Sequence, residues 1–139
     1  MADMPAPTPA GDRPLSPHVQ IYRWPLTMLT SILHRVTGGA LAAGIIVIAL
    51  WLVATAYGRD TFRLAHEMLT AWYGRFILFG FTVALLYHLL NGIRHLCWDA
   101  GWGFQLKTAR NTGLLVFAGT IILTIVVWFA GYWIAGALP

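Results

Sequence analysis

The chain has 139 residues, of which 58% are hydrophobic and only 10% are charged. A soluble domain carries about 25% charged residues, so the composition excludes a soluble globular domain and a disordered chain. The formal net charge of +4 includes a single lysine, Lys107, and does not provide the clustered basic surface of a nucleic-acid-binding protein. The single cysteine, Cys97, excludes an intrachain disulfide framework. These exclusions leave a membrane protein.

The N-terminal part of the sequence is rich in proline. Residues 1–29 contain six prolines and no apolar core of a signal peptide, so none is expected. Residues 1–12 are predicted to be a disordered tail, because proline prevents helix formation and the segment has little apolar surface to bury. Residues 13–139 are predicted to form one transmembrane domain.

Three long windows of the sequence contain no charged residue, namely 36–58, 76–93 and 111–139. A helix rises 1.5 Å per residue, so about 20 apolar residues cross the roughly 30 Å of hydrocarbon in a bilayer. The middle window is the shortest, but apolar residues continue it past Arg94, whose long side chain can carry its charge towards the interface. The windows therefore predict an all-α fold with three transmembrane helices, at about 30–57, 75–99 and 111–136.

The basic residues are unevenly divided between the two ends of these predicted helices. Six lie at the end that carries the N-terminus: Arg13, Arg23, Arg35, Arg94, Lys107 and Arg110. Three lie at the opposite end: Arg59, Arg63 and Arg75. The positive-inside rule then predicts that the N-terminus is inside and the C-terminus outside.

One histidine, His88, lies within the charge-free windows, which contain no Asp, Glu, Lys or Arg. An intramembrane ionisable residue is a candidate functional residue. Ala84 and Gly92 lie one helical turn to either side of it, which leaves space for a porphyrin ligated through the imidazole. The same small residues are also typical of helix–helix packing in lipid, so both interpretations are open.

A second axial ligand to such a haem must approach the iron from the opposite side. His95 lies on the same face as His88, about 10 Å further along the helix, and does not meet this requirement. His34 is possible in principle, but it lies nearer the inner end of its helix than His88 does. A ligand from a second subunit is therefore favoured.

Polar residues gather at the start of the first predicted helix. Ser31 and Arg35 are four residues apart and share a face with Gly38. They can act as a helix cap and an interfacial anchor. A less favoured interpretation is that they bind a polar head group at the inner edge of the membrane, where a hydroxyl and a guanidinium can hydrogen-bond a quinone carbonyl.

Three stretches of the sequence carry a specific resemblance. They are RPLSPHVQIYRWP (Arg13 to Pro25), SILHRVTG (Ser31 to Gly38) and YHLLNGIRHLCWD (Tyr87 to Asp99). In this order, and with the three-helix layout, they resemble the cytochrome b556 membrane-anchor subunit of succinate dehydrogenase, respiratory complex II. Residues 1–12 and the third predicted helix carry no motif.

The resemblance implies a role for each matching residue. His88 corresponds to an axial ligand of haem b, and the second axial histidine is implied to come from another membrane-anchor subunit. Ser31 and Arg35 correspond to residues of the ubiquinone site. Positions near the haem propionates, or in the surroundings of the haem, are matched by His34, Arg35, Arg94 and His95.

The resemblance also implies an assembly in the respiratory chain. Its partners would be a second membrane anchor, an iron–sulfur subunit and a flavoprotein subunit, and the flavoprotein would oxidise succinate. No complete active site is then expected in this chain. Two alternatives are the anchor of a menaquinol-dependent fumarate reductase and a haem-free structural membrane anchor. The absence of an Arg- and Ser-rich presequence favours the bacterial cytoplasmic membrane over the mitochondrial inner membrane.

Overall fold

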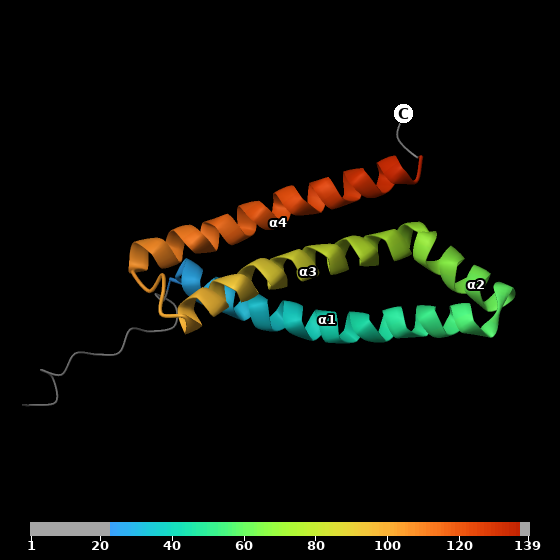
Figure 1. Cartoon of the computed structure of the whole chain (residues 1–139), viewed down its shortest axis with the longest axis horizontal. Helices are drawn as coiled ribbons and strands as arrows, with labels where there is room; N and C mark the ends of the chain where they lie inside the picture. Colours follow the sequence, from blue (N-terminus) through green and yellow to red (C-terminus); the bar gives the residue numbers. More distant parts are fainter. Residues whose placement is uncertain (1–22, 137–139) are drawn as a thin grey trace, which may run out of the picture.

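A computed structural model describes residues 23–136, which fold into four α-helices (Figure 1). They are α1 (Leu26–Tyr57), α2 (Arg59–Thr70), α3 (Trp72–Asp99) and α4 (Leu106–Ile134). α1, α3 and α4 are each long and apolar enough to cross a membrane. The predicted all-α fold with three spans is therefore confirmed. The predicted tail over 1–12, and the stretch from Arg13 as far as residue 22, lie outside the described residues.

The helices extend beyond the predicted spans at several ends. α1 begins at Leu26 rather than residue 30, directly after Pro25, whose fixed φ and missing N–H suit a helix start. α3 begins at Trp72 rather than 75, and α4 runs from Leu106 to Ile134 rather than 111 to 136. Charge-free windows locate the hydrocarbon-spanning part of a helix, whereas the backbone hydrogen bonds continue into the interface.

The segment between the first two spans contains a further helix that the charge-free windows do not predict. It is α2, a short amphipathic helix that follows a sharp turn at Gly58, where φ is 124°. That backbone conformation is readily available only to glycine. Ala65 and Leu69 are half-buried on the side of α2 towards the other helices, and the ring centroid of Phe62 lies 6.2 Å from that of Trp51 on α1.

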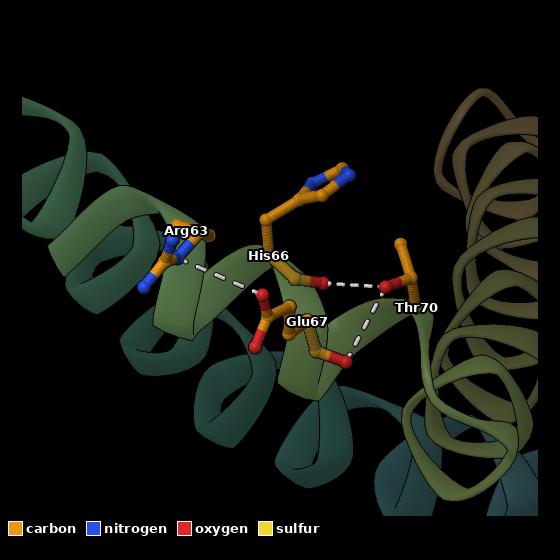
Figure 2. A network of polar contacts seen from close by, with 4 residues as sticks. All are labelled: Arg63, His66, Glu67 and Thr70. Atoms are coloured by element: carbon orange, nitrogen blue, oxygen red, sulfur yellow. Dashed lines mark hydrogen bonds and ion pairs between the residues drawn. The ribbon is translucent and has the colours of Figure 1, made fainter. Parts of the chain in front are cut away.

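The opposite face of α2 is polar and exposed (Figure 2). Arg63 and Glu67 form an ion pair one turn apart, with 3.8 Å between nitrogen and oxygen. The Thr70 hydroxyl donates to the backbone carbonyls of His66 and Glu67 and so satisfies acceptors in the last turn. A helix with one apolar and one charged face is suited to lie at the membrane surface.

α3 is the central helix and packs against both α1 and α4 (Figure 1). The first turns of α1 and α4 lie near the end of α3, whereas α2 joins the opposite ends of α1 and α3. Consecutive spans are therefore antiparallel. Gly74 lets the chain turn tightly from α2 into α3, because a Cβ there would overlap the backbone carbonyls of Met68 and Leu69.

The buried residues of the spans are mostly small or polar, whereas most of the large apolar side chains are exposed. The buried residues of α3 and α4 include Ala84, Ala109, Gly113, Thr120 and Thr124. Close packing of small residues is typical of helices in lipid, where apolar surface gains nothing by turning inwards. The outer surfaces of all three spans expose leucine and isoleucine, which fits contact with acyl chains.

Candidate functional site

His88 lies on α3 in the contact surface with α1, and its side chain is half-buried. Its Nδ1 lies 3.1 Å from the backbone carbonyl oxygen of His34 and 3.3 Å from the hydroxyl oxygen of Thr37. A carbonyl oxygen only accepts hydrogen bonds, so Nδ1 must carry the ring proton. The lone pair of the neutral imidazole is then on Nε2, which is the atom left to bind a ligand or a metal.

Two glycines lie at this contact between α1 and α3, and Gly38 is the one at which a side chain would be crowded. A Cβ on Gly38 of α1 would lie 3.1 Å from Cε1 of His88, and one on Gly92 of α3 would lie 3.8 Å from Cε1 of His34. Each glycine therefore faces the imidazole of the other helix. Ala84, the small residue on the other side of His88, is buried. These small residues take part in helix packing, which was one of the two interpretations of the pattern.

Three imidazole rings meet between α1 and α3. His34 stacks on His88 with ring centroids 3.9 Å apart and an angle of 8° between the planes. His95 lies 5.0 Å from His34 and makes an edge contact with Trp98. We call His34, His88 and His95 the histidine cluster. Within residues 23–136, no group of three or more His, Cys, Asp or Glu side chains is arranged to hold a bare metal ion.

The residues present fit a haem ligated by His88. Its Nδ1–H is held by a backbone carbonyl, and Nε2 forms no hydrogen bond with any residue between 23 and 136. The neighbouring Nδ1 of His34 is buried and has no hydrogen-bond partner in the described part of the chain. Because stacked rings present their faces to each other, His34 is not placed to ligate the same iron from the opposite side.

Arg94 belongs to a separate buried network in which α1, α3 and α4 meet. Only 6% of the residue is exposed. Its guanidinium donates to the hydroxyls of Thr30 and Thr112, at 3.0 and 3.1 Å, and to the amide oxygen of Asn91 and the carbonyl of Ala109, at 3.2 and 2.9 Å. It also lies 4.0 Å above the ring of Trp98.

Thr30 is the point on α1 at which this network converges. Besides its bond from Arg94, its backbone carbonyl accepts hydrogen bonds from the Tyr87 hydroxyl at 2.9 Å and from the Asn91 amide at 3.4 Å. Thr30 and Asn91 are fully buried. We call Thr30, Tyr87, Asn91, Arg94 and Thr112 the arginine network. The network therefore holds α1 against α3 at Thr30, the residue that precedes Ser31.

Ser31 and Arg35 lie one turn apart on α1. Ser31 is half-buried and Arg35 is exposed. Neither side chain hydrogen-bonds to another residue within 23–136, so both polar groups remain available to a ligand or a partner. The structure thus brings His34, His88 and His95 together. Ser31 and Arg35 lie on the same segment of α1 as His34. Arg94 belongs instead to the arginine network.

A family model described as succinate dehydrogenase/fumarate reductase transmembrane subunit matches residues 10–127. The chain belongs to this family. It is 46% identical over 122 residues to the succinate dehydrogenase cytochrome b556 subunit of Paracoccus denitrificans, covering 86% of this chain and 94% of that protein. The b556 subunit of Rickettsia felis is 39% identical over 116 residues, which is 84% of this chain and 90% of its own length. The mitochondrial cytochrome b560 subunit of Sus scrofa is 37% identical over 119 residues, with 82% of this chain and 69% of that protein covered.

The predicted resemblance to a succinate dehydrogenase cytochrome b556 membrane anchor is confirmed by these matches. As a member of the family, the chain is a membrane-anchor subunit of a larger enzyme complex. The assignments of individual residues to haem and quinone stay predictions.

Two sets of contacts within this family member were not predicted from its sequence. They are the arginine network and the contact of Thr37 with His88. Tyr87, Asn91, Arg94 and Trp98 follow a spacing of four, three and four residues, which places polar groups on one face of an apolar helix. That spacing is a signal for the network. The Thr37 contact depends on the register between α1 and α3, which no local pattern determines.

Proposed function

We propose that the chain is the cytochrome b membrane anchor of a succinate:quinone oxidoreductase, in which it shares one haem b with a second anchor subunit and forms part of the ubiquinone-reduction site. The observation that carries this proposal is the 3.1 Å contact between Nδ1 of His88 and the backbone carbonyl oxygen of His34. The Nδ1–H of His88 is engaged by this carbonyl, which leaves the Nε2 lone pair for iron. Haem b, when bound, supplies reversible one-electron redox chemistry.

A second anchor subunit is part of the proposal because this chain offers only one side of a haem site. His34 faces His88 through its ring plane, and His95 lies on the same helix as His88. The opposing axial ligand would therefore come from a partner helix. An iron–sulfur subunit and a flavoprotein subunit complete the proposed complex, with succinate oxidised on the flavoprotein.

Ser31 and Arg35 are proposed to bind the quinone head group. The Ser31 hydroxyl would donate a hydrogen bond to a quinone oxygen, and the Arg35 guanidinium would stabilise the negative charge that reduction places on the quinone. His34 lies between them in sequence and belongs to the histidine cluster, so the haem and quinone sites would be adjacent. His34, Arg35 and His95 are also candidates to bind or surround the haem propionates. Arg94 was predicted for the same role, but four of its N–H groups already have partners within the protein.

The haem assignment is tested by the spectrum of the purified complex. His88→Ala or His88→Tyr should abolish or perturb the low-spin b-type spectrum, measured as the reduced-minus-oxidised difference. His66→Ala, which changes an exposed histidine on α2, is the matched control and should leave the spectrum unchanged. An unaltered spectrum in the His88 variants would refute ligation by this residue. A haem-free anchor predicts no b-type absorbance even in the wild-type complex.

The quinone assignment is tested by separating two activities of the complex. Ser31→Ala removes one hydrogen bond to the quinone and should lower quinone reductase activity about three- to tenfold. Succinate oxidation with a soluble electron acceptor should be spared. Thr55→Ala removes a hydroxyl near the other end of α1 and is the control. Equal loss of both activities in the Ser31 variant would exclude the assignment.

A menaquinol-dependent fumarate reductase is the second candidate, because the matching family includes both enzymes. Quinone potential and the soluble subunits determine the direction of the reaction, so extraction of the quinones from purified membranes discriminates between the two. The cytoplasmic membrane of a bacterium is the proposed location, which the relatives from Paracoccus and Rickettsia support. The mitochondrial relative from Sus scrofa gives the alternative.

A further inference from the structure

Thr37 on α1 makes two kinds of contact at once. Its hydroxyl lies 2.8 Å from the carbonyl oxygen of Leu33 and 3.0 Å from that of His34, and donates its single proton within its own helix. Its oxygen also lies 3.3 Å from Nδ1 of His88 on α3. Because the hydroxyl proton is directed at a carbonyl, the oxygen has a lone pair available for the Nδ1–H of His88.

Other threonines in the spans show what a threonine without this second contact looks like. Thr82, Thr120 and Thr124 each donate to the carbonyl four residues earlier in the same helix. Such back-bonding is usual for threonine in a helix and needs no functional explanation. Thr37 differs because it reaches a side chain on another helix.

We propose that Thr37 is a positioning residue for His88. Its hydroxyl oxygen and the carbonyl oxygen of His34 both accept the hydrogen bond from the Nδ1–H of the imidazole. Two acceptors on the same N–H fix both the tautomer and the rotation of the ring. They also make Nε2 a stronger electron donor, because hydrogen bonding at the far nitrogen raises the basicity of an imidazole ligand. This inference rests on the proposed ligation of haem iron by His88.

A stronger donor favours the oxidised form of the iron to which it is bound, and so lowers the reduction potential of the haem. The side chain of Thr37 can be changed, whereas the His34 carbonyl is part of the backbone. Substitution of Thr37 therefore isolates one of the two acceptors. Loss of the hydroxyl should raise the haem potential while the other acceptor keeps the tautomer.

The experiment compares Thr37→Val, Thr37→Ser and Thr82→Val in the purified complex. Valine keeps the shape of threonine without the hydroxyl, and serine keeps the hydroxyl without the methyl group. The measurements are haem content, the potentiometric midpoint of the haem and its low-spin electron paramagnetic resonance signal. Thr37→Val should shift the midpoint upwards and alter the low-spin signal, whereas Thr37→Ser and Thr82→Val should match the wild type.

The outcomes distinguish the role of Thr37 from the proposed ligation of haem iron by His88. Loss of haem from Thr37→Val with retention in Thr37→Ser would also support a role for the hydroxyl. An unchanged midpoint in Thr37→Val, or equal changes in the valine and serine variants, would overturn the role of Thr37 while leaving ligation by His88 intact. If His88→Ala retains a normal spectrum, the proposed ligation by His88, on which this inference rests, fails.

Discussion

At the scale of single residues, the position of His88 depends on the absence of a side chain opposite it. Gly38 brings α1 so close that a Cβ would lie 3.1 Å from the imidazole, closer than ordinary van der Waals contact. The neighbouring Gly39 faces open space within the described part of the chain, with no atom within 4 Å of its Cβ position. The two glycines therefore provide a matched pair.

Gly38→Ala should displace the His88 imidazole by a few tenths of an ångström and perturb the haem site. We expect a lower ratio of haem to protein and a shifted reduced-minus-oxidised spectrum in the purified complex. Gly39→Ala should leave both unchanged and favour the helix, since alanine is a better helix former than glycine by about 1 kcal/mol. Identical behaviour of the two variants would contradict the close contact at Gly38.

The sequence predicts these sites only in part. A charge-free window and the resemblance lead to His88, Ser31, His34 and Arg35 without a structure. The spacing of Asn91 and Arg94 on one helix face signals a polar network, but the partners of Arg94 on α1 and α4 could not be predicted, because they depend on how these helices pack against α3. The contact of Thr37 with His88 depends on the packing of two helices that are 51 residues apart at this point.

At the scale of the helices, the arginine network is the polar contact that joins all three spans. Its members on α1 and α3 are buried and Thr112 on α4 is half-buried, and four N–H groups of one guanidinium bond to Thr30, Asn91, Thr112 and the carbonyl of Ala109. A hydrogen bond between transmembrane helices contributes about 0.6 kcal/mol on average and up to about 1.7. Several such bonds to a single charged group indicate that Arg94 stabilises the packing of the three spans.

Arg94→Met should reduce the stability of the complex by roughly 1–3 kcal/mol, because it leaves the buried acceptors of the network without donors. The measurement is the temperature at which the purified complex releases haem and aggregates. Arg110→Met removes the same charge from an exposed position on α4 and is the control. A similar decrease for both variants would mean that the network does not stabilise the packing of the spans.

The helix α2 illustrates what a hydropathy pattern leaves undetermined. The segment between the first two spans contains charged residues and lacks the length for a span, so it reads as a loop. Its charges nevertheless recur at helical spacing, as Arg59, Arg63 and Glu67 do. That arrangement, and the apolar residues on the other face, are sufficient for a short helix once the membrane surface and the neighbouring spans are present to cover it.

At the scale of the whole molecule, the antiparallel spans gather the basic residues at two ends. The start of α1 and the start of α4 lie together, with Arg23 shortly before α1 and Lys107 and Arg110 on α4, whereas α2 lies at the opposite end (Figure 1). The larger number of basic residues at the end that contains the N-terminus predicts that this end faces the cytoplasm. The proposed quinone residues Ser31 and Arg35 are near the same end, where an iron–sulfur subunit would dock and protons would be taken up.

Cysteine labelling tests this orientation without altering the basic residues. In a Cys97→Ser background, Asp60→Cys on α2 and Gln105→Cys before α4 each introduce one thiol at an exposed position. A membrane-impermeant maleimide should label Asp60→Cys in intact spheroplasts, and Gln105→Cys only after the membrane is permeabilised. The reverse pattern would place the N-terminal end outside and would separate Ser31 and Arg35 from a cytoplasmic electron donor. Labelling of both sites in intact spheroplasts would show that the chain does not insert in one orientation, which contradicts the positive-inside assignment.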